Sequence, residues 1–111
     1  MTDWKDVGAL ADVPLLGARK VRTATGCVAL FRGADDRVFA LDDRCPHRGG
    51  PLSEGIVHDG RVTCPLHNWV IDLTRGKATG ADVGATRTHA VEVVDGRLML
   101  DFSALSAWKA G

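Results

Sequence analysis

The sequence predicts an all-β fold, and three observations support this prediction. Short runs of β-branched and other apolar residues recur at intervals typical of a sandwich or small barrel. Two Asp-Gly pairs, Asp59-Gly60 and Asp95-Gly96, separate such runs. Asp-Gly favours a two-residue hairpin because both turn positions need positive φ. Helical composition is confined to residues 104–109, where Leu105 and Trp108 have i, i+3 spacing that favours one short helix.

The predicted strands follow one another through short turns. A turn at Thr25-Gly26 separates the first two strands, and a turn at Asp35-Asp36, assisted by Gly33, precedes the third. A turn is also expected at Arg75-Gly76, and a surface loop over residues 80–85. The strands are expected at Arg19–Thr23, Gly26–Arg32, Val38–Leu41, Ile56–Val57, around Val62, and at Trp69–Leu73, Ala90–Val94 and Leu98–Phe102.

Length and composition predict one compact domain over residues 1–111 that lies in the cytoplasm. The 45% hydrophobic and 25% charged residues are a globular balance, and 14 Lys+Arg against 14 Asp+Glu give no basic excess for nucleic-acid binding. The start MTDWKD lacks the apolar run of a secretory signal, and no apolar stretch is long enough to span a bilayer. Three cysteines in such a chain favour metal binding or burial over a disulfide framework.

Two cysteine–histidine pairs are the candidate metal ligands. Cys45-Pro46-His47 has the pattern C-x-H, and Cys64-Pro65-Leu66-His67 has the pattern C-x-x-H, with residues 48–63 between them. Each pair opens a loop with Pro or Gly at the end of a predicted strand, and the Asp59-Gly60 hairpin lies between the loops. A lone Cys is more often a small buried residue than a ligand. Two such pairs in matched loops instead favour one shared metal site.

Zinc and a 2Fe-2S cluster are the two alternatives for this site. Two thiolates and two imidazoles suit tetrahedral zinc, but zinc sites usually pair Cys with Cys and His with His at spacings of two to five residues. A 2Fe-2S cluster in which one iron binds both thiolates and the other both imidazoles requires each loop to supply one ligand of each type. The mixed pairs therefore favour the cluster.

At all four positions the pattern resembles the Rieske family. That resemblance implies an antiparallel β-sandwich with a small cluster-binding lobe of two loops, here expected at about residues 43–70, and one 2Fe-2S cluster per chain held by Cys45, His47, Cys64 and His67. High-potential Rieske proteins carry a disulfide between the two loops, at positions that correspond here to Gly50 and Leu66. They also carry Ser and Tyr after the last ligand, where this chain has Asn68-Trp69. These differences predict a potential below about 0 mV, at the low end of the Rieske range.

A wider set of residues resembles the small subunit of assimilatory NAD(P)H-dependent nitrite reductase. The similarity extends from Trp4 to about Phe102 and is tightest from Cys45 to Asp82, including His67-Asn68-Trp69 and Gly80-Ala81-Asp82. It implies one-electron transfer within an enzyme that reduces nitrite to ammonium, beside a large subunit with sirohaem and flavin. The alternative is a free Rieske ferredoxin that serves an aromatic-ring dioxygenase through a reductase and oxygenase pair. No catalytic residue, nucleic-acid partner or membrane contact is expected on this chain.

Other residues receive plainer interpretations. Cys27 is expected to be buried within a strand, and Trp69 to pack beneath the lobe. His58 and His89 are expected at the surface. Three arginines near the ligand loops either steer docking to an acidic partner or form a solvated rim; they are Arg44, Arg48 and Arg61.

Overall fold

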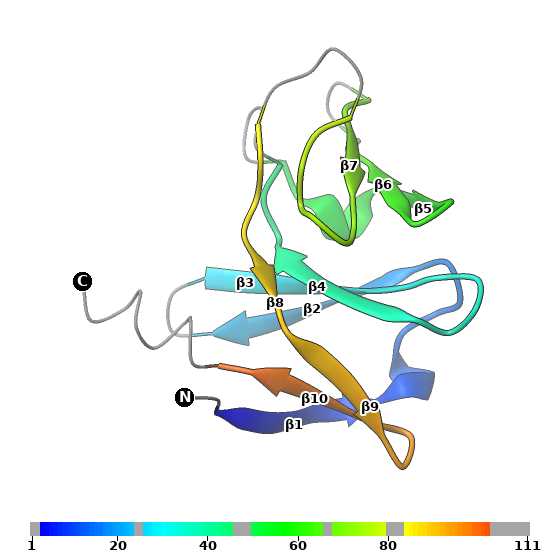
Figure 1. The fold of residues 1–111 in the computed structure, drawn as a ribbon, viewed down its shortest axis with the longest axis vertical. Coiled ribbons are helices and arrows are strands. Elements are labelled where there is room, and N and C mark those ends of the chain that lie inside the picture. The colour runs from blue at the N-terminus through cyan, green and yellow to red at the C-terminus, as the bar shows by residue number, and fades with distance from the viewer. Residues whose placement is uncertain (1–2, 24–25, 46–49, 66–67, 80–83, 103–111) are drawn as a thin grey trace.

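Three antiparallel sheets make up the fold (Figure 1). The computed structural model describes residues 3–23, 26–45, 50–65, 68–79 and 84–102. Within them, β1, β10 and β9 form one sheet, β2, β3, β4 and β8 a second, and β5, β6 and β7 a third. The first two sheets face one another as a sandwich, and the third lies beyond the second sheet (Figure 1). The all-β prediction is therefore confirmed.

The element bounds agree closely with the predicted strands in the middle of the chain. Two short 3-10 helices, η1 (Leu10–Asp12) and η2 (Leu52–Glu54), accompany the strands. The strands are β1 (Trp4–Ala9), β2 (Ala18–Thr23), β3 (Gly26–Arg32), β4 (Val38–Asp42), β5 (Ile56–His58), β6 (Arg61–Thr63), β7 (Val70–Asp72), β8 (Thr88–His89), β9 (Val91–Val94) and β10 (Arg97–Asp101). The strands β1 and β8 were not predicted, and the predicted helix at 104–109 lies outside the described residues.

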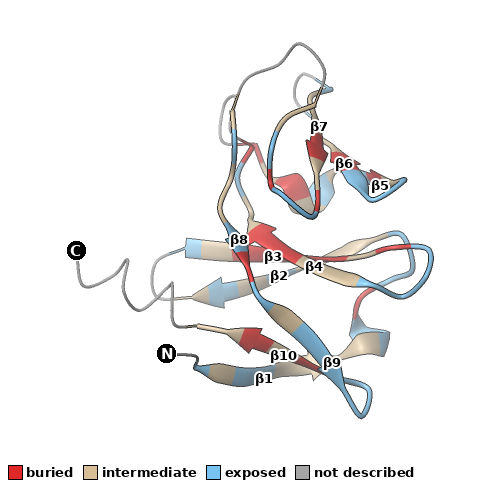
Figure 2. Ribbon diagram, in the orientation of Figure 1, coloured by how far each residue is buried: buried red, intermediate tan, exposed pale blue. Residues whose placement is uncertain are grey.

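Strand β3 is buried on both faces because it lies between two hydrophobic cores. Val28 and Leu30 point into the core shared with β10, whereas Ala29 and Phe31 point toward the third sheet. All four are fully buried. Figure 2 shows buried segments on β3, β4 and β10, and again within the third sheet. The second sheet therefore contributes side chains to both cores. The core on its outer face packs the third sheet against the sandwich.

Both Asp-Gly pairs form the predicted hairpin turns. Asp59 and Gly60 have φ of 49° and 71° between β5 and β6, and Asp95 and Gly96 have φ of 51° and 75° between β9 and β10. In the β3–β4 turn the residue with positive φ is Asp36, at 65°. Short polar side chains adopt this conformation more readily than branched ones. The local turn chemistry is therefore sufficient to define these hairpins.

The helix η2 and the strands β5 and β6 lie within residues 43–70, the range expected for the cluster-binding lobe, and β7 begins at the end of that range and continues to Asp72. The chain leaves the sandwich after β4 and returns at β8, so two neighbouring segments connect the lobe to it (Figure 1). We call these segments, residues 42–44 and 84–87, the neck. No helix in the described residues has the length and apolar character needed to cross a membrane.

Candidate metal centre

The two cysteines of the predicted site lie in the core that joins the lobe to the second sheet. Cys45 is 2% exposed and Cys64 is 1% exposed. Both belong to the cluster of buried residues that includes Phe31, Leu52 and Ile71. No disulfide joins them. Two buried thiols in one core are in keeping with ligation of one buried group.

The two cysteine loops are closed in the same way. The backbone N–H of Cys45 donates to the carbonyl of Gly50 at 2.8 Å, and that of Cys64 donates to the carbonyl of Trp69 at 2.7 Å. In each loop the amide of the cysteine thus bonds to the residue five positions later. The second loop has one further bond, from the amide of Asn68 to the carbonyl of Cys64 at 3.1 Å. The C-x-H and C-x-x-H loops are therefore each closed by the same backbone hydrogen bond at the cysteine.

The two predicted histidine ligands, His47 and His67, lie outside the described residues. Within the described ranges no group of three or more Cys, His, Asp and Glu is placed to hold a metal ion. The structure therefore describes half of the predicted ligand set. That half fits a metal centre, since a pair of buried cysteines can supply two thiolates at the start of matched loops.

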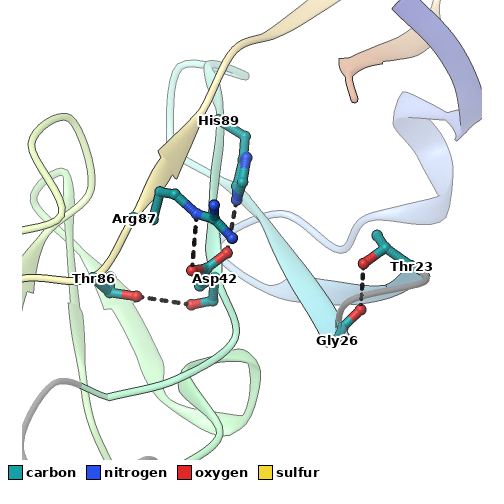
Figure 3. A network of polar contacts seen from close by, with 6 residues as sticks. All are labelled: Thr23, Gly26, Asp42, Thr86, Arg87 and His89. Atoms are coloured by element: carbon teal, nitrogen blue, oxygen red, sulfur yellow. Dashed lines mark hydrogen bonds and ion pairs between the residues drawn. The ribbon is translucent and has the colours of Figure 1, made fainter. Parts of the chain in front are cut away.

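A polar network around Asp42 joins the two segments of the neck (Figure 3). The Asp42 carboxylate accepts a hydrogen bond from His89 Nε2 at 2.7 Å and from Arg87 Nε at 3.3 Å. The Asp42 backbone accepts from the Thr86 hydroxyl at 3.4 Å, and its N–H donates to the Arg87 carbonyl at 2.8 Å. Because Asp42 precedes Cys45 by three residues, this network fixes the stem of the first cysteine loop.

His89 was expected at the surface, and that expectation is wrong. Its side chain is 0% exposed, and Nδ1 has no hydrogen-bond partner among the described residues. A carboxylate only accepts hydrogen bonds, so Nε2 carries the proton shared with Asp42. His89 lies on β8, the edge strand of the second sheet, where it pairs with the buried Ala40 of β4.

The other residues singled out from the sequence differ in how far they are buried. Trp69 is partly buried against the core beneath the lobe, as predicted, and Arg44 and Arg61 are exposed, whereas Arg48 lies outside the described residues. Cys27 is only partly buried, not buried as expected, since it is the second residue of β3, next to the exposed Gly26. His58 is partly buried and bonds the Thr63 hydroxyl across β5 and β6 at 2.7 Å.

A cavity of about 440 Å³ lies between the β3–β4 turn and the β5–β6 turn. Leu16, Phe39 and Val57 supply its apolar lining, with Asp35 and Arg37 at its edge. Its lining residues include no Cys, His, Ser or Lys. The described lining therefore offers no thiol, hydroxyl, amine or imidazole group.

Comparison with known proteins identifies the family. The model of the Rieske [2Fe-2S] domain matches residues 3–95. The chain belongs to the Rieske [2Fe-2S] domain family. The cofactor is accordingly a 2Fe-2S cluster, as the mixed cysteine–histidine pairs predicted. The family places the Rieske chain among electron carriers.

Curated relatives of the Rieske chain include proteins of different size. It is 40% identical over 99 residues to the anthranilate 1,2-dioxygenase ferredoxin subunit of Burkholderia cepacia, with 88% of the chain and 91% of that protein covered. It is 51% identical over 45 residues to the vanillate O-demethylase oxygenase subunit of a Pseudomonas strain. That match covers 40% of the chain and 14% of the oxygenase subunit.

Solved structures share the fold over nearly the whole chain. A protein described as an NADH-dependent nitrite reductase small subunit from Mycobacterium tuberculosis has a TM-score of 0.82 and 24% identity, with 91% and 96% of the two chains covered. A protein described as an NADPH nitrite reductase small subunit has a TM-score of 0.79 and 25% identity, with 88% and 97% covered. The fold of this chain is thus shared with both of these proteins over most of its length.

Proposed function

We propose that this Rieske chain transfers one electron at a time through a cluster held by Cys45, His47, Cys64 and His67. The observation that carries the proposal is the matched pair of loops, each beginning at a buried cysteine whose amide is bonded five residues on. When bound, the cluster accepts and releases a single electron. The chain's own part is to hold the two thiolates in the core and to supply one imidazole from each loop.

The proposed partner is the large sirohaem- and flavin-containing subunit of NAD(P)H-dependent nitrite reductase, in the cytoplasm. The stretches His67-Asn68-Trp69 and Gly80-Ala81-Asp82 support this partner by their resemblance to small subunits of that enzyme. Solved structures with that description match over 91% and 88% of this chain. The chain would then be a subunit of the enzyme with no catalytic residue of its own, and nitrite would be reduced on the large subunit.

A free ferredoxin of a dioxygenase is the second candidate. The 40% identity to the anthranilate 1,2-dioxygenase ferredoxin subunit over most of both chains favours it. Identity alone separates roles poorly in this family, because 51% identity over 45 residues is also found with an oxygenase subunit of which the chain spans 14%. For this reason the stretches His67-Asn68-Trp69 and Gly80-Ala81-Asp82 carry more weight in our choice of partner.

The ligand assignment is tested by replacing single ligands. Cys45→Ser and Cys64→Ser should each abolish the visible spectrum of the cluster and weaken folding of the lobe, because cluster binding and folding are linked. Cys27→Ser is the matched control, since it removes the third thiol and should leave the spectrum unchanged. A variant at Cys45 or Cys64 with a full visible spectrum would show that the assignment is wrong.

The partner is tested by affinity purification of the tagged Rieske chain from its own cells grown on nitrite. We expect a large protein with a sirohaem spectrum to co-purify, and nitrite-dependent NAD(P)H oxidation by that protein to increase when the chain is added. Electron transfer from a flavin reductase to a dioxygenase, without any sirohaem protein in the complex, would instead support the ferredoxin role.

A further inference from the structure

Asp43 is a carboxylate buried at the stem of the first ligand loop. Its side chain is 2% exposed, and it stands two residues before Cys45. Burial of a charged group costs free energy unless hydrogen bonds and opposite charges compensate it. The contacts of this carboxylate therefore indicate its role.

Donors surround the Asp43 carboxylate. Oδ1 accepts the backbone N–H of Ser53 at 2.7 Å, and Oδ2 accepts the Ser53 hydroxyl at 2.7 Å. The ammonium group of Lys20, on β2, lies 3.8 Å from Oδ2 and is 49% exposed. The backbone N–H of Asp43 donates to the carbonyl of Cys27 at 3.0 Å. The described partners of this carboxylate are all donors, so both of its oxygens are satisfied as hydrogen-bond acceptors.

The bonds between Asp43 and Ser53 connect the two ends of the first loop, where no strand pairing among the described residues does so. The second loop is extended by the β6–β7 ladder, in which Thr63 pairs with Val70 directly below the Cys64–Trp69 bond. After Gly50 the first loop continues into Pro51 and η2 rather than into a strand. The bonds from Asp43 to Ser53 lie one step outside the Cys45–Gly50 bond. A side chain thus replaces the β ladder.

We infer that Asp43 positions the first ligand loop and lowers the reduction potential of the cluster, and that Lys20 opposes this lowering. Reduction adds one electron to the cluster and breaks no bond in the protein. A carboxylate near the cluster and away from water disfavours that added negative charge, whereas a nearby ammonium group favours it. The inference rests on the proposed function, since it takes Cys45 as a ligand.

Redox titration of charge variants tests this inference. Asp43→Asn keeps the shape and still accepts the Ser53 N–H, so the cluster should remain and its midpoint potential should become more positive. Lys20→Gln should shift the midpoint in the negative direction, by less, because Lys20 is half-exposed and water screens its charge. Asp59→Asn is the matched control, as it removes the same charge from an 85% exposed side chain and should leave the midpoint close to that of the wild type.

The positioning role has a separate readout. Ser53→Ala retains the Asp43 charge but removes the hydroxyl donor, so the cluster should be lost faster in the presence of an iron chelator. An unchanged half-time of loss would overturn the positioning role.

The electrostatic role has its own contrary results. A midpoint in Asp43→Asn that is unchanged, or lower than that of wild type, would overturn it. If Asp43→Asn assembles no cluster, Lys20→Gln decides, since a negative shift supports the inference and an unchanged midpoint overturns it. Failure of the ligand assignment is seen separately, as a visible spectrum that persists in Cys45→Ser.

Discussion

Asp42 shows how much of the neck depends on one side chain. Its carboxylate and backbone contact Thr86, Arg87 and His89, which lie 44 to 47 positions further along the chain. The buried imidazole gains its hydrogen bond from this contact, and the returning segment is thereby held beside the segment that leads to Cys45. The hydrogen bonds of Asp42 thus stabilise both the buried His89 and the stem of the first loop.

A second charged pair, far from the cysteines, predicts a pH dependence of stability. The hydrogen bonds from Arg97 at 3.0 Å, and that from the Gly8 N–H at 2.9 Å, lower the pKa of Asp6 below the ordinary value of 3.8 for an aspartate. A carboxyl group whose pKa is lower in the folded state stabilises the fold above its unfolded pKa, and this stabilisation is lost as pH falls through the folded pKa.

The wild type should therefore melt at a higher temperature than Asp6→Asn near neutral pH, and this difference should shrink as pH falls below about 3.8. Thermal melts at low salt over that range measure the effect, which is small because the pair is exposed. Asp95→Asn, at an exposed turn, is the control. A difference in melting temperature that does not change with pH would contradict this account.

Residue-scale prediction from sequence succeeds where the chemistry is local and fails where it is not. The positive φ at Asp59 and Asp95 follows from the Asp-Gly dipeptide itself. The burial of His89 depends on Asp42, 47 positions away, and on the two-residue strand β8, which is too short for a local sequence pattern to predict. The buried role of Asp43 is missed for the same reason, because Ser53 and Lys20 meet it only in the fold.

At the scale of elements, the hairpins were predictable and the edge pairing was not. The pairs β2–β3, β3–β4, β5–β6 and β9–β10 are each joined by only a few residues, so their pairing can be read from neighbouring residues. In β1, by contrast, the register with β10 shifts between Asp6 and Ala9, which breaks a regular alternation. Its strand character arises from pairing with residues close to the other end of the described chain.

The turn after β7 shows how tightly the returning segment is packed on the lobe. Gly76 has φ of 70°, and a Cβ at this position would overlap the carbonyl oxygen of Thr86, beside the neck network. The N–H of Thr86 in turn donates to the carbonyl of Gly76 at 2.7 Å. The residue is therefore constrained by both its φ and its neighbour.

Gly76→Ala should destabilise the fold by roughly 2 kcal/mol or more, because the cost of about 1 kcal/mol for positive φ adds to the steric overlap. Gly96→Ala is the matched control, since Gly96 has φ of 75° and no heavy atom near the added Cβ. Urea unfolding of the two variants isolates the overlap as the difference in free energy of unfolding. Equal losses in the two variants would contradict the packing seen at Thr86.

At the scale of the whole molecule, the two cores explain how a small domain holds a redox centre. The sandwich core and the lobe core share β3, and the cysteines are built into the second of these. The all-β class and the cofactor were both predictable, because strand alternation and the mixed cysteine–histidine spacing are short-range signals. The partner was not, because proteins similar to this chain over most of its length are described as a dioxygenase ferredoxin subunit and as a nitrite reductase small subunit.

The whole-molecule prediction for redox behaviour is a midpoint potential below about 0 mV, within the Rieske range of about −150 to +300 mV. Gly50 in the first loop cannot form a disulfide, and the chain has no Tyr to donate a hydroxyl to the cluster. The buried Asp43 carboxylate acts in the same direction. A redox titration of the purified protein checks the value, and a midpoint near the upper end of the range would contradict it.

The most direct test of the central claim is pulsed electron paramagnetic resonance of the dithionite-reduced protein with and without ¹⁵N-labelled histidine. Coordination of one iron by His47 and His67 predicts two strongly coupled histidine nitrogens, whose couplings change on labelling, and predicts that His47→Cys or His67→Cys retains at most one. A reduced cluster with no strong coupling to histidine nitrogen, or a colourless protein that contains one zinc, would contradict the account.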